Sequence, residues 1–375
     1  MPPSTPANPG TPVSEIETPA LIVELDLLEE NLQTMAGFMS GYPEVSWRAH
    51  AKTHKCVELA RRQIAAGAIG ICVQKTGEAE VFAGAGIEDI LVTNQVVDPR
   101  KLQRLARLAG RSRIAVCCDD PDNARAIGAA AEAEGTRIGV LIEIETGAKR
   151  AGVDGTAALA ATIAAIEDNG NLHFRGLQAY NGPAQHKRTM AERQAAITYT
   201  ADRVRAALRF LESQGVACET VTGGGTGTFP LEAASGVYTE VQPGSFIFMD
   251  ADYARNGETG GTVFAAFRQS LFVLTSVTSL RPGQYALVDA GHKAAAVDSG
   301  MPVLHGQNGV TFTRAADDYG VIEFEQGSGN LSLGRQLRLI PGHCDPTVNL
   351  HDWILGVRDG VVECCWKVDA RGALL

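Results

Sequence analysis

The sequence lacks the features that mark several protein classes. It contains no run of about 18 apolar residues, the length that a membrane-spanning helix needs. Its 33 Lys and Arg residues are outnumbered by 43 Asp and Glu residues, and a net charge of −10 provides no field that would attract nucleic acid or anionic lipid. The 8 cysteines form no CxxC pair, so neither a zinc ribbon nor a disulfide framework is indicated. We therefore expect a cytoplasmic protein without a nucleic-acid or membrane partner.

The length and composition are typical of a large globular protein. The 375 residues are 45% hydrophobic and 20% charged, which is sufficient for a sizeable core. This length predicts two domains, or one large barrel with an appendage. The 41 glycines exceed the usual share of about 7% and indicate many tight turns or close backbone contacts. Residues 1–15 are rich in proline and lack the apolar segment of a signal peptide, so we expect them to be a flexible leader.

Short apolar runs alternate with helical patterns between about residues 45 and 250, which is typical of βα units around a parallel sheet. Eight such units favour a TIM (β/α)8 barrel over an open doubly wound sheet, which usually has five or six strands. Two helix starts are marked by an N-cap aspartate followed by proline, at Asp98-Pro99 and Asp120-Pro121. The eight expected strands are 45–51, 69–73, 90–93, 114–118, 138–144, 174–180, 219–223 and 241–248.

After about residue 262 the helical period disappears and strand patterns follow one another. The last of them, 354–368, indicates a hairpin around Asp359-Gly360. The sequence therefore predicts a barrel at 27–255 and an antiparallel β domain at 256–375. An early strand within 16–26 could belong to either domain on pattern alone.

A lysine follows the first expected strand. Ala49 and Ala51 alternate with polar residues, which places Lys52 where an inward-facing strand ends. Catalytic residues of such barrels gather at the carboxyl ends of the strands. Partial burial there would lower the pKa of Lys52 and free its amine to form a Schiff base. The alternative interpretation is a solvated surface lysine.

The densest glycine cluster, TGGGTGTF at 222–229, follows the seventh expected strand. Consecutive glycines let backbone N–H groups approach an anion, and barrels often bind phosphate near strands seven and eight. The cluster includes Gly224, Gly225 and Thr226, and the next strand adds Gly244 and Ser245. It is not a Walker motif, because no Lys-Ser/Thr pair follows. A flexible turn is the alternative.

A reactive lysine at strand one and a phosphate cradle at strands seven and eight together favour pyridoxal phosphate as the cofactor. Polar residues at the other strand ends are candidate ligands, although polar residues are common in loops. His54 and His186 are candidate acid–base groups, or else structural histidines. The polar candidates are Gln74, Asn94, Glu145, Arg150 and Tyr180.

The expected β domain contains PGHCDPTVNLHDW at 341–353. In an extended segment His343 and Asp345 project from the same face, while Cys344 points away. Two such ligands with water would form an open site for a divalent ion, Mn²⁺ or Mg²⁺ rather than Zn²⁺. A hydrogen-bonded pair in a loop is the alternative for this short motif.

Six motifs in order resemble the D-threonine aldolase and 3-hydroxy-D-aspartate aldolase family. They are RAHAKTHK, ICVQKTGEAEVFAGAGI, QAYNGPAQH, TGGGTGT, YTEVQPGSFIFMDADY and PGHCDPTVNLHDW, and the resemblance covers roughly residues 16–372. This family belongs to the fold-type III pyridoxal phosphate enzymes, with alanine racemase and D-serine dehydratase. The resemblance implies an N-terminal barrel, a β domain that includes the early strand, a homodimer and a divalent metal beside the cofactor.

Roles carry over from the family motif by motif. The resemblance implies that Lys52 carries the cofactor as a Schiff base and that Gln74 lies by its ring. It implies phosphate binding by Thr226, Gly244 and Ser245, cofactor contact by Tyr253, and metal binding by His343 and Asp345. The sequence departs from the family at Thr76-Gly77, at His292 and in GAKRAGV, which lacks a cysteine after Arg150. Of these, His292 could alter the substrate pocket.

The expected reaction is cleavage of a D-3-hydroxy-amino acid, such as D-threonine, D-phenylserine or 3-hydroxy-D-aspartate, to glycine and an aldehyde. His186 is a candidate base for the β-hydroxyl. The nearest alternative is a dehydratase of D-serine or 3-hydroxyaspartate, but relatives that eliminate water tend to carry H-x-C where this chain has Asp345. A non-catalytic carrier of pyridoxal phosphate, or an alanine-type racemase, would need no metal motif.

Overall fold

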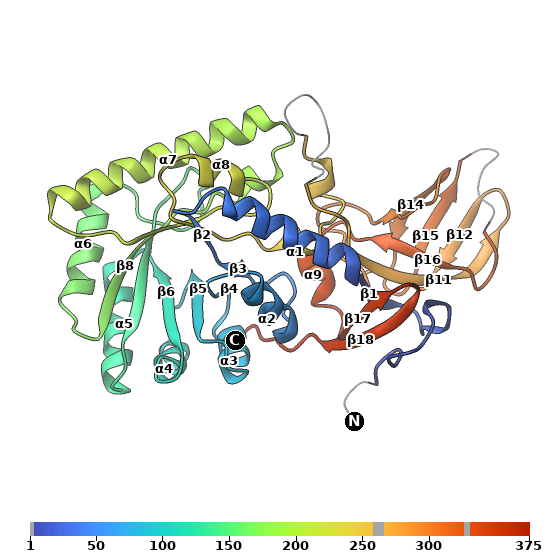
Figure 1. Cartoon of the computed structure of the whole chain (residues 1–375), viewed down its shortest axis with the longest axis horizontal. Helices are drawn as coiled ribbons and strands as arrows, with labels where there is room; N and C mark the ends of the chain where they lie inside the picture. The colour runs from blue at the N-terminus through green and yellow to red at the C-terminus, as the bar shows by residue number, and fades with distance from the viewer. Residues whose placement is uncertain (1–3, 258–265, 326–330) are drawn as a thin grey trace.

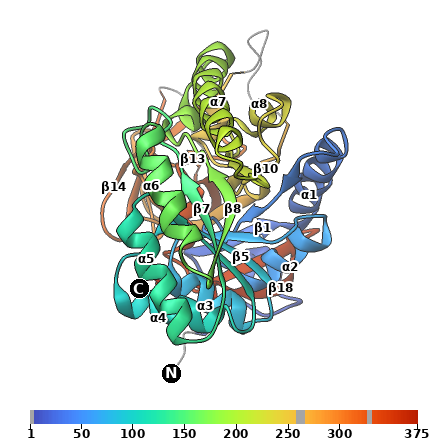
Figure 2. The same cartoon turned by 90° about the vertical axis from the view of Figure 1, so that its left-hand side faces the viewer.

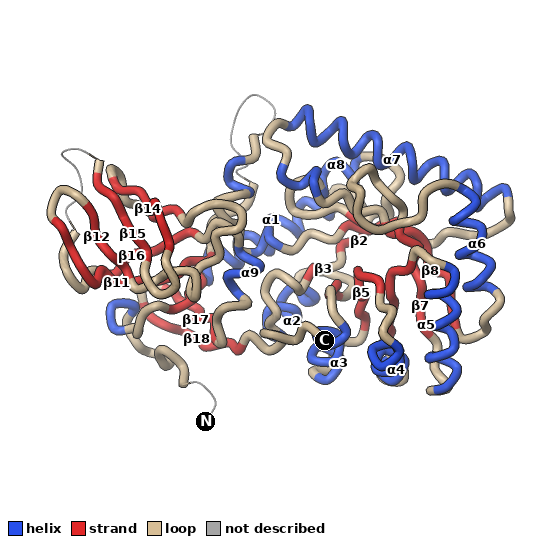
Figure 3. The backbone as a smooth tube through the Cα atoms, turned by 180° about the vertical axis from the view of Figure 1, so that it is seen from behind, coloured by secondary structure: helices blue, strands red, loops and turns tan. Residues whose placement is uncertain are grey.

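The computed structural model describes residues 4–257, 266–325 and 331–375, and every statement below concerns these residues. Two bodies lie side by side, one of strands wrapped by helices and one built mainly of strands (Figure 1, Figure 3). The expected TIM barrel with an antiparallel β domain is confirmed. No helix in the described ranges is long and apolar enough to cross a membrane.

The barrel is a parallel sheet that closes on its first strand. β2 and β3 are the two halves of that strand, separated at Arg48; β2 pairs with β10 and β3 pairs with β4, so the two ends of the sheet meet. The strands are β2 Ser46–Trp47, β3 Ala49–His50, β4 Ile71–Val73, β5 Asp89–Gln95, β6 Arg113–Cys118, β7 Ile138–Glu143, β8 Leu172–Gln178, β9 Thr220–Gly223 and β10 Glu240–Val241.

Helices between the strands cover the outside of the barrel, and Figure 2 shows α4, α5 and α6 in front of the strands. Two of them begin where the sequence predicts: the side chains of Asp98 and Asp120 accept hydrogen bonds from first-turn N–H groups, and each is followed by proline. The helices are α1 Leu25–Ser40, α2 Val57–Ala65, α3 Thr76–Gly84, α4 Pro99–Leu108, α5 Pro121–Ala133, α6 Thr156–Glu167, α7 Met190–Ser213 and α8 Phe229–Ala234.

The expected strand at 241–248 is wrong over most of its length. Pairing ends at Val241, and Ser245–Ile247 form a 3-10 helix. Phe246 and Ile247 are fully buried in this short helix, so their apolar character reflects packing rather than membership of the sheet. Apolar runs of this length do not by themselves distinguish a strand from another buried segment.

The second body is an antiparallel sheet completed by a strand from the other end of the chain. β1 pairs with β11 on one side and with β17 on the other. The hairpin between β17 and β18 turns at Asp359 and Gly360, both with positive φ, as predicted. The strands are β1 Ala20–Glu24, β11 Leu271–Arg281, β12 Tyr285–Val288, β13 Val303–Leu304, β14 Val310–Ala315, β15 Gly320–Phe324, β16 Gln336–Ile340, β17 Trp353–Arg358 and β18 Val361–Lys367.

The segment expected to be a flexible leader packs against this sheet over its described part, residues 4–15. Gly10 N–H donates to Val362 O at 2.8 Å, and Val13 N–H donates to Gly360 O at 2.9 Å. Ala7 is buried in a small cluster with residues of β1, β11 and β18. The described part of this segment is therefore held along the edge of the sheet by backbone hydrogen bonds to β18 and the turn before it. Residues 1–3 lie outside the described ranges.

The barrel interior holds a buried ion network near the amino ends of its strands. Arg48, 1% exposed, donates to Asp89 Oδ1 at 2.6 Å and to Glu240 Oε1 at 3.1 Å. Burial alone lowers the pKa of Arg48, but the charges of Glu240 and Asp89 outweigh burial and hold that pKa above its usual value. Arg48 therefore stays charged and ties the first strand to β5 and β10.

Replacing Arg48 with Met should lower the free energy of unfolding by about 3–5 kcal/mol, because two buried carboxylates lose their main partner. Urea unfolding measured by circular dichroism would give this value. The matched control is Arg125→Ala, which removes an exposed ion pair with Asp122 and should cost less than about 1 kcal/mol. Equal losses in the two variants would contradict a stabilising role for the buried network.

Candidate active site

A pocket of about 380 Å³ opens at the carboxyl ends of the barrel strands. The pocket is lined from six of the eight strands of the barrel, either by the strand itself or by the loop that follows it. These residues meet because parallel strands present all their carboxyl ends on one face. Five of the residues expected from sequence lie here. The lining residues are His50, Lys52, Gln74, Thr93, Arg150, Gln178, Tyr180, Gly182, Pro183, His186 and Gln242.

Lys52 joins the two bodies at this pocket. Its Nζ lies 2.5 Å from Oδ2 of Asp345, which belongs to the short helix α9 (Cys344–Val348) of the β domain. Burial lowers the pKa of Lys52, but the charge of Asp345 outweighs burial and raises that pKa above its usual value. The expectation of a lowered pKa for Lys52 is therefore wrong for this arrangement. No pattern around Lys52 indicates that a carboxylate from the other domain lies opposite its amine.

His343 and Asp345 do not lie in an extended segment, contrary to expectation. His343 is the N-cap residue of α9, and Asp345 lies in its first turn. His343 Nδ1 lies 2.7 Å from Asp298 Oδ2, a contact that fixes the ring and leaves Nε2 available to a ligand. Burial raises the pKa of Asp345, but Lys52 and His343 more than offset this effect and keep the carboxylate ionised. Within the described ranges no three His, Cys, Asp or Glu residues are grouped as metal ligands.

His186 is held by a buried carboxylate. Its Nδ1 lies 2.5 Å from Oδ2 of Asp252, while Arg188 and Arg255 donate to the other oxygen at 2.5 Å. Burial raises the pKa of Asp252, and these hydrogen bonds bring it below its usual value, so the carboxylate stays ionised. With Nδ1 engaged, Nε2 is the ring nitrogen free to act toward the pocket. The Tyr253 ring packs on the imidazole with centroids 5.4 Å apart.

The glycine cluster folds into a tight loop behind the pocket. A Cβ added at Gly227 would lie 2.3 Å from Gln185 O, and one added at Gly244 would lie 2.7 Å from Thr53 Oγ1, so side chains are excluded at both positions. Thr226 Oγ1 accepts a hydrogen bond from Phe246 N–H at 3.0 Å and ties the two halves of the loop together. Ser245 Oγ lies 3.4 Å from Asp345 Oδ1.

Backbone donors in this loop are without acceptors. Within the described part of the chain, the N–H groups of Gly225, Thr226 and Gly244 donate no hydrogen bond. Buried backbone N–H groups are almost always paired, so these three donors are ones that a bound anion would satisfy. Glu232 lies below Gly224, and burial raises its pKa to about 7, with a smaller opposing effect from the Thr228 hydroxyl. The raised pKa reduces the negative charge that Glu232 would otherwise place near this loop.

Three further expected residues form the pocket wall. Arg150 donates to Glu143 Oε1 at 2.7 Å and stacks over the Tyr180 ring at 5.2 Å. Gln74 Nε2 lies 3.0 Å from Thr93 Oγ1 and 3.1 Å from His50 Nε2. The aromatic ring and the guanidinium thus shape one side of the pocket, and the amide group the other.

Sequence reasoning missed part of the site. His50, Gln178 and Gln242 face the pocket from inside the barrel, and the period-2 alternation of their strands would have indicated this inward direction. Asp252 and Asp298, which orient the two histidines, carry no comparable signal because their partners are distant in sequence. His54 is buried away from the pocket. Its Nδ1 accepts from Cys56 N–H at 3.1 Å, its Nε2 donates to Gln63 Oε1 at 3.0 Å, and burial lowers its pKa to about 4.

Comparison with known proteins identifies the chain's relatives. Residues 23–252 match the model of the alanine racemase N-terminal domain, and residues 270–357 match the putative serine dehydratase domain. The chain is 44% identical to a 3-hydroxy-D-aspartate aldolase of Paracoccus denitrificans (strain Pd 1222), covering 98% of this chain and 95% of that protein. It is 45% identical to a D-threonine aldolase of an Arthrobacter species, covering 98% and 96%. The chain belongs to the D-threonine aldolase and 3-hydroxy-D-aspartate aldolase family.

The three-dimensional similarity to this family is as extensive as the sequence similarity. The crystal structure of D-threonine aldolase from Filomicrobium marinum matches with a TM-score of 0.95 and 44% identity, covering 99% of this chain and 100% of that one. The family's barrel is of the fold-type III kind, which implies pyridoxal phosphate. Lys52 at the barrel mouth and the unpaired N–H groups of the glycine loop fit the aldehyde and the phosphate of that cofactor.

The departures from the family's motifs leave the pocket intact. His292 is exposed, and its backbone rather than its ring is held, through a hydrogen bond to Ala316 O at 2.8 Å. It is absent from the pocket lining, so the expected effect on the substrate pocket finds no support. Gly77 N–H donates to Leu375 O at 2.7 Å, and a Cβ there would lie 2.9 Å from that oxygen. Packing against residues 373–375 accounts for glycine at this position.

Proposed function

We propose that this chain is a lyase that cleaves D-3-hydroxy-amino acids to glycine and an aldehyde, using pyridoxal phosphate and a divalent cation. The observation that carries the proposal is that Lys52 and His186 line one pocket and that Asp345 contacts the Lys52 amine. The identity to D-threonine aldolase and 3-hydroxy-D-aspartate aldolase over nearly the whole chain supports it.

The residues that we assign to the cofactor come from the pocket lining and from the glycine loop behind it. Lys52 would hold its aldehyde carbon, the loop with Gly224, Gly225, Thr226, Gly244 and Ser245 would bind its phosphate, and Gln74, Arg150 and Tyr180 would flank its ring. Bound pyridoxal phosphate supplies an electron sink for the pair left on Cα when the Cα–Cβ bond breaks. Tyr253, whose ring packs on the His186 imidazole with centroids 5.4 Å apart, would also contact the cofactor.

The bond breaks only when the β-hydroxyl loses its proton. His186 has Nδ1 committed to Asp252, so Nε2 would accept that proton. A divalent cation held by His343 and Asp345, with Mn²⁺ or Mg²⁺ preferred by this nitrogen and oxygen donor set, would lower the pKa of the hydroxyl. Two protein ligands leave the remaining coordination positions open to water and substrate.

Dehydration of D-serine or 3-hydroxyaspartate is the second candidate, because residues 270–357 match a putative serine dehydratase domain. Asp345 favours cleavage over dehydration, since the resemblance associates water elimination with cysteine at this position. A non-catalytic cofactor carrier is disfavoured by the ordered His186–Asp252 pair, which a carrier would not need. The expected homodimer stays a prediction.

Purified enzyme offered a panel of D- and L-3-hydroxy-amino acids should release glycine from the D forms only. Chromatography of the products decides between glycine with an aldehyde and a 2-oxo acid with ammonia. The Lys52→Ala variant should lose both the activity and the visible absorbance of the cofactor. A 2-oxo acid as the main product would favour the dehydratase, and unchanged absorbance in Lys52→Ala would overturn the cofactor assignment.

Replacing Asp252 with Asn should lower kcat by about 100-fold or more, because His186 loses the acceptor that orients it. The matched control is Arg255→Ala, which removes a donor to the same carboxylate but leaves the His186 contact in place. Steady-state kinetics and a pH–rate profile would separate the two variants. Equal losses of activity in both would show that the carboxylate supports the loop rather than the imidazole.

Dialysis against a chelator should abolish cleavage, and added Mn²⁺ or Mg²⁺ should restore it. The His343→Ala variant should regain little activity at the same cation concentration, whereas His305→Ala, in the β domain but away from the pocket, should behave as the wild type. Full activity in excess chelator would contradict a metal at His343 and Asp345.

A further inference from the structure

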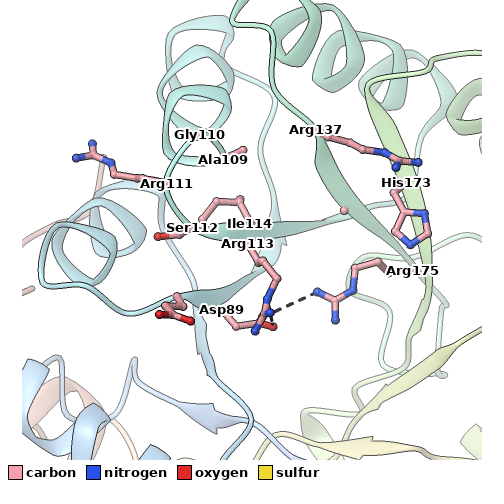
Figure 4. A pocket seen from close by; sticks show the side chains of 12 residues that line it. Asp89, Ala109, Gly110, Arg111, Ser112, Arg113, Ile114, Arg137, His173 and Arg175 are labelled. Carbon is pink, nitrogen blue, oxygen red and sulfur yellow. Dashed lines mark hydrogen bonds and ion pairs between the residues drawn. The ribbon is translucent and has the colours of Figure 1, made fainter.

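A second pocket has a volume of about 730 Å³, and Figure 4 shows the side chains that line it. Lys52 follows the carboxyl end of β3, so this pocket lies at the opposite end of the barrel from Lys52. It opens at the amino ends of β5, β6, β7 and β8 and shares no lining residue with the candidate active site. Its lining is rich in arginine although the whole chain has a net charge of −10. The charged lining residues are Arg111, Arg113, Arg137 and Arg175 against Glu88 and Asp89, and His173 is also present.

The strand starts explain why these residues meet. β5 begins at Asp89, β6 begins at Arg113, and Arg137 directly precedes β7. Asp89 is paired with Arg113 in register, and Gly139 with His173. Because parallel strands start at the same edge, charges placed at each start are brought together there.

Arg175 enters the pocket through a local irregularity of the sheet. The register between β7 and β8 shifts at Val140 and Leu141, whose partners are Phe174 and Gly176, so Arg175 is the extra residue of a β-bulge. A Cβ added at Gly139 would lie 2.6 Å from Cδ of Arg175, so the absence of a side chain at Gly139 provides the space. A bulge and a glycine thus direct one arginine into the pocket.

The positive charge is only partly neutralised. Asp89 lies 2.6 Å from Arg48, 3.2 Å from Arg113 and 3.9 Å from Arg175, so one carboxylate is shared among three guanidinium groups. Arg137 is exposed, and its side chain makes no hydrogen bond or ion pair in the described part of the chain. In Figure 4 Arg113 and Arg175 converge on Asp89, whereas Arg111 extends away from the others. Arg113, Arg137 and Arg175 are therefore the donors with N–H groups to spare.

Each guanidinium presents a planar fork of donors that matches the oxygens of phosphate or carboxylate. Arg113 lies in β6, Arg137 just before β7 and Arg175 in β8, so a ligand that engages all three must carry more than one anionic group. The lining includes no Phe, Tyr or Trp on which a nucleobase would stack. We propose that this pocket binds a small anion with at least two phosphate groups, independently of the reaction at the other end of the barrel.

The test is isothermal titration calorimetry with inorganic pyrophosphate, on cofactor-loaded protein at about 0.15 M salt, the ionic strength at which exposed charges are already screened. Wild-type protein should bind pyrophosphate more tightly than it binds orthophosphate or citrate. The Arg113→Ala/Arg137→Ala variant should weaken pyrophosphate binding at least about tenfold, since two charge-assisted hydrogen-bonding groups are lost. Both side chains are exposed, so the variant should fold and keep the visible absorbance of the cofactor.

The matched control is Arg209→Ala/Arg314→Ala, which removes the same charge from two exposed positions outside the pocket. Its affinity for pyrophosphate should equal that of the wild type. Pyrophosphate can also remove a divalent cation from the protein. This effect would be the same in the wild type, the pocket variant and the control, so it does not change the difference in affinity between them. The proposed site would be overturned if the wild type does not bind pyrophosphate, if the pocket variant binds it as tightly as the wild type, or if the control loses as much affinity as the pocket variant. Tighter binding of citrate than of pyrophosphate would overturn the phosphate assignment.

Discussion

The contact between Lys52 and Asp345 is the constraint on which the candidate active site depends. The two residues are 293 positions apart and belong to different bodies, yet Nζ and Oδ2 lie 2.5 Å apart. Neither body contains a complete site: the barrel contributes the amine and the anion cradle, and the β domain contributes the carboxylate and His343. A charged amine inside a partly buried pocket needs a counter-charge, and here it comes from the other domain.

Charged, apolar and polar side chains occupy successive layers of the barrel interior along the barrel axis. Arg48, Asp89 and Glu240 form a charged level near the amino ends of the strands. A small apolar cluster of Cys72, Leu91, Ala115, Cys117 and Leu141 fills the middle. Polar side chains, among them His50, Gln178 and Gln242, face the pocket at the carboxyl ends. The apolar level keeps the charges at one end apart from the reactive amine at the other.

Much of this arrangement could be predicted from sequence because strand ends are marked locally. The positions of Lys52, Gln74, Arg150 and Tyr180 follow from counting βα units, and all four line the pocket together with His186, which was predicted as an acid–base group. The conformation around Asp345 was mispredicted, although Asp345-Pro346 repeats the aspartate–proline signal that correctly placed α4 and α5. The contacts of Asp252 with His186 and of Asp298 with His343 depend on how distant loops pack, which no local pattern encodes.

The placement of β1 has a consequence for synthesis of the chain. Ala20–Glu24 is made first, but the partners of β1 are Leu271–Arg281 and Trp353–Arg358. At about 5–20 residues per second, this apolar strand waits on the order of tens of seconds for its neighbours. Most barrel strands pair with the next strand along the chain and wait less; the exception is β2, which pairs with β10 only after Val241 has been made. On the ribosome β1 is therefore an unpaired strand edge, open to association with other nascent chains until the end of the protein emerges.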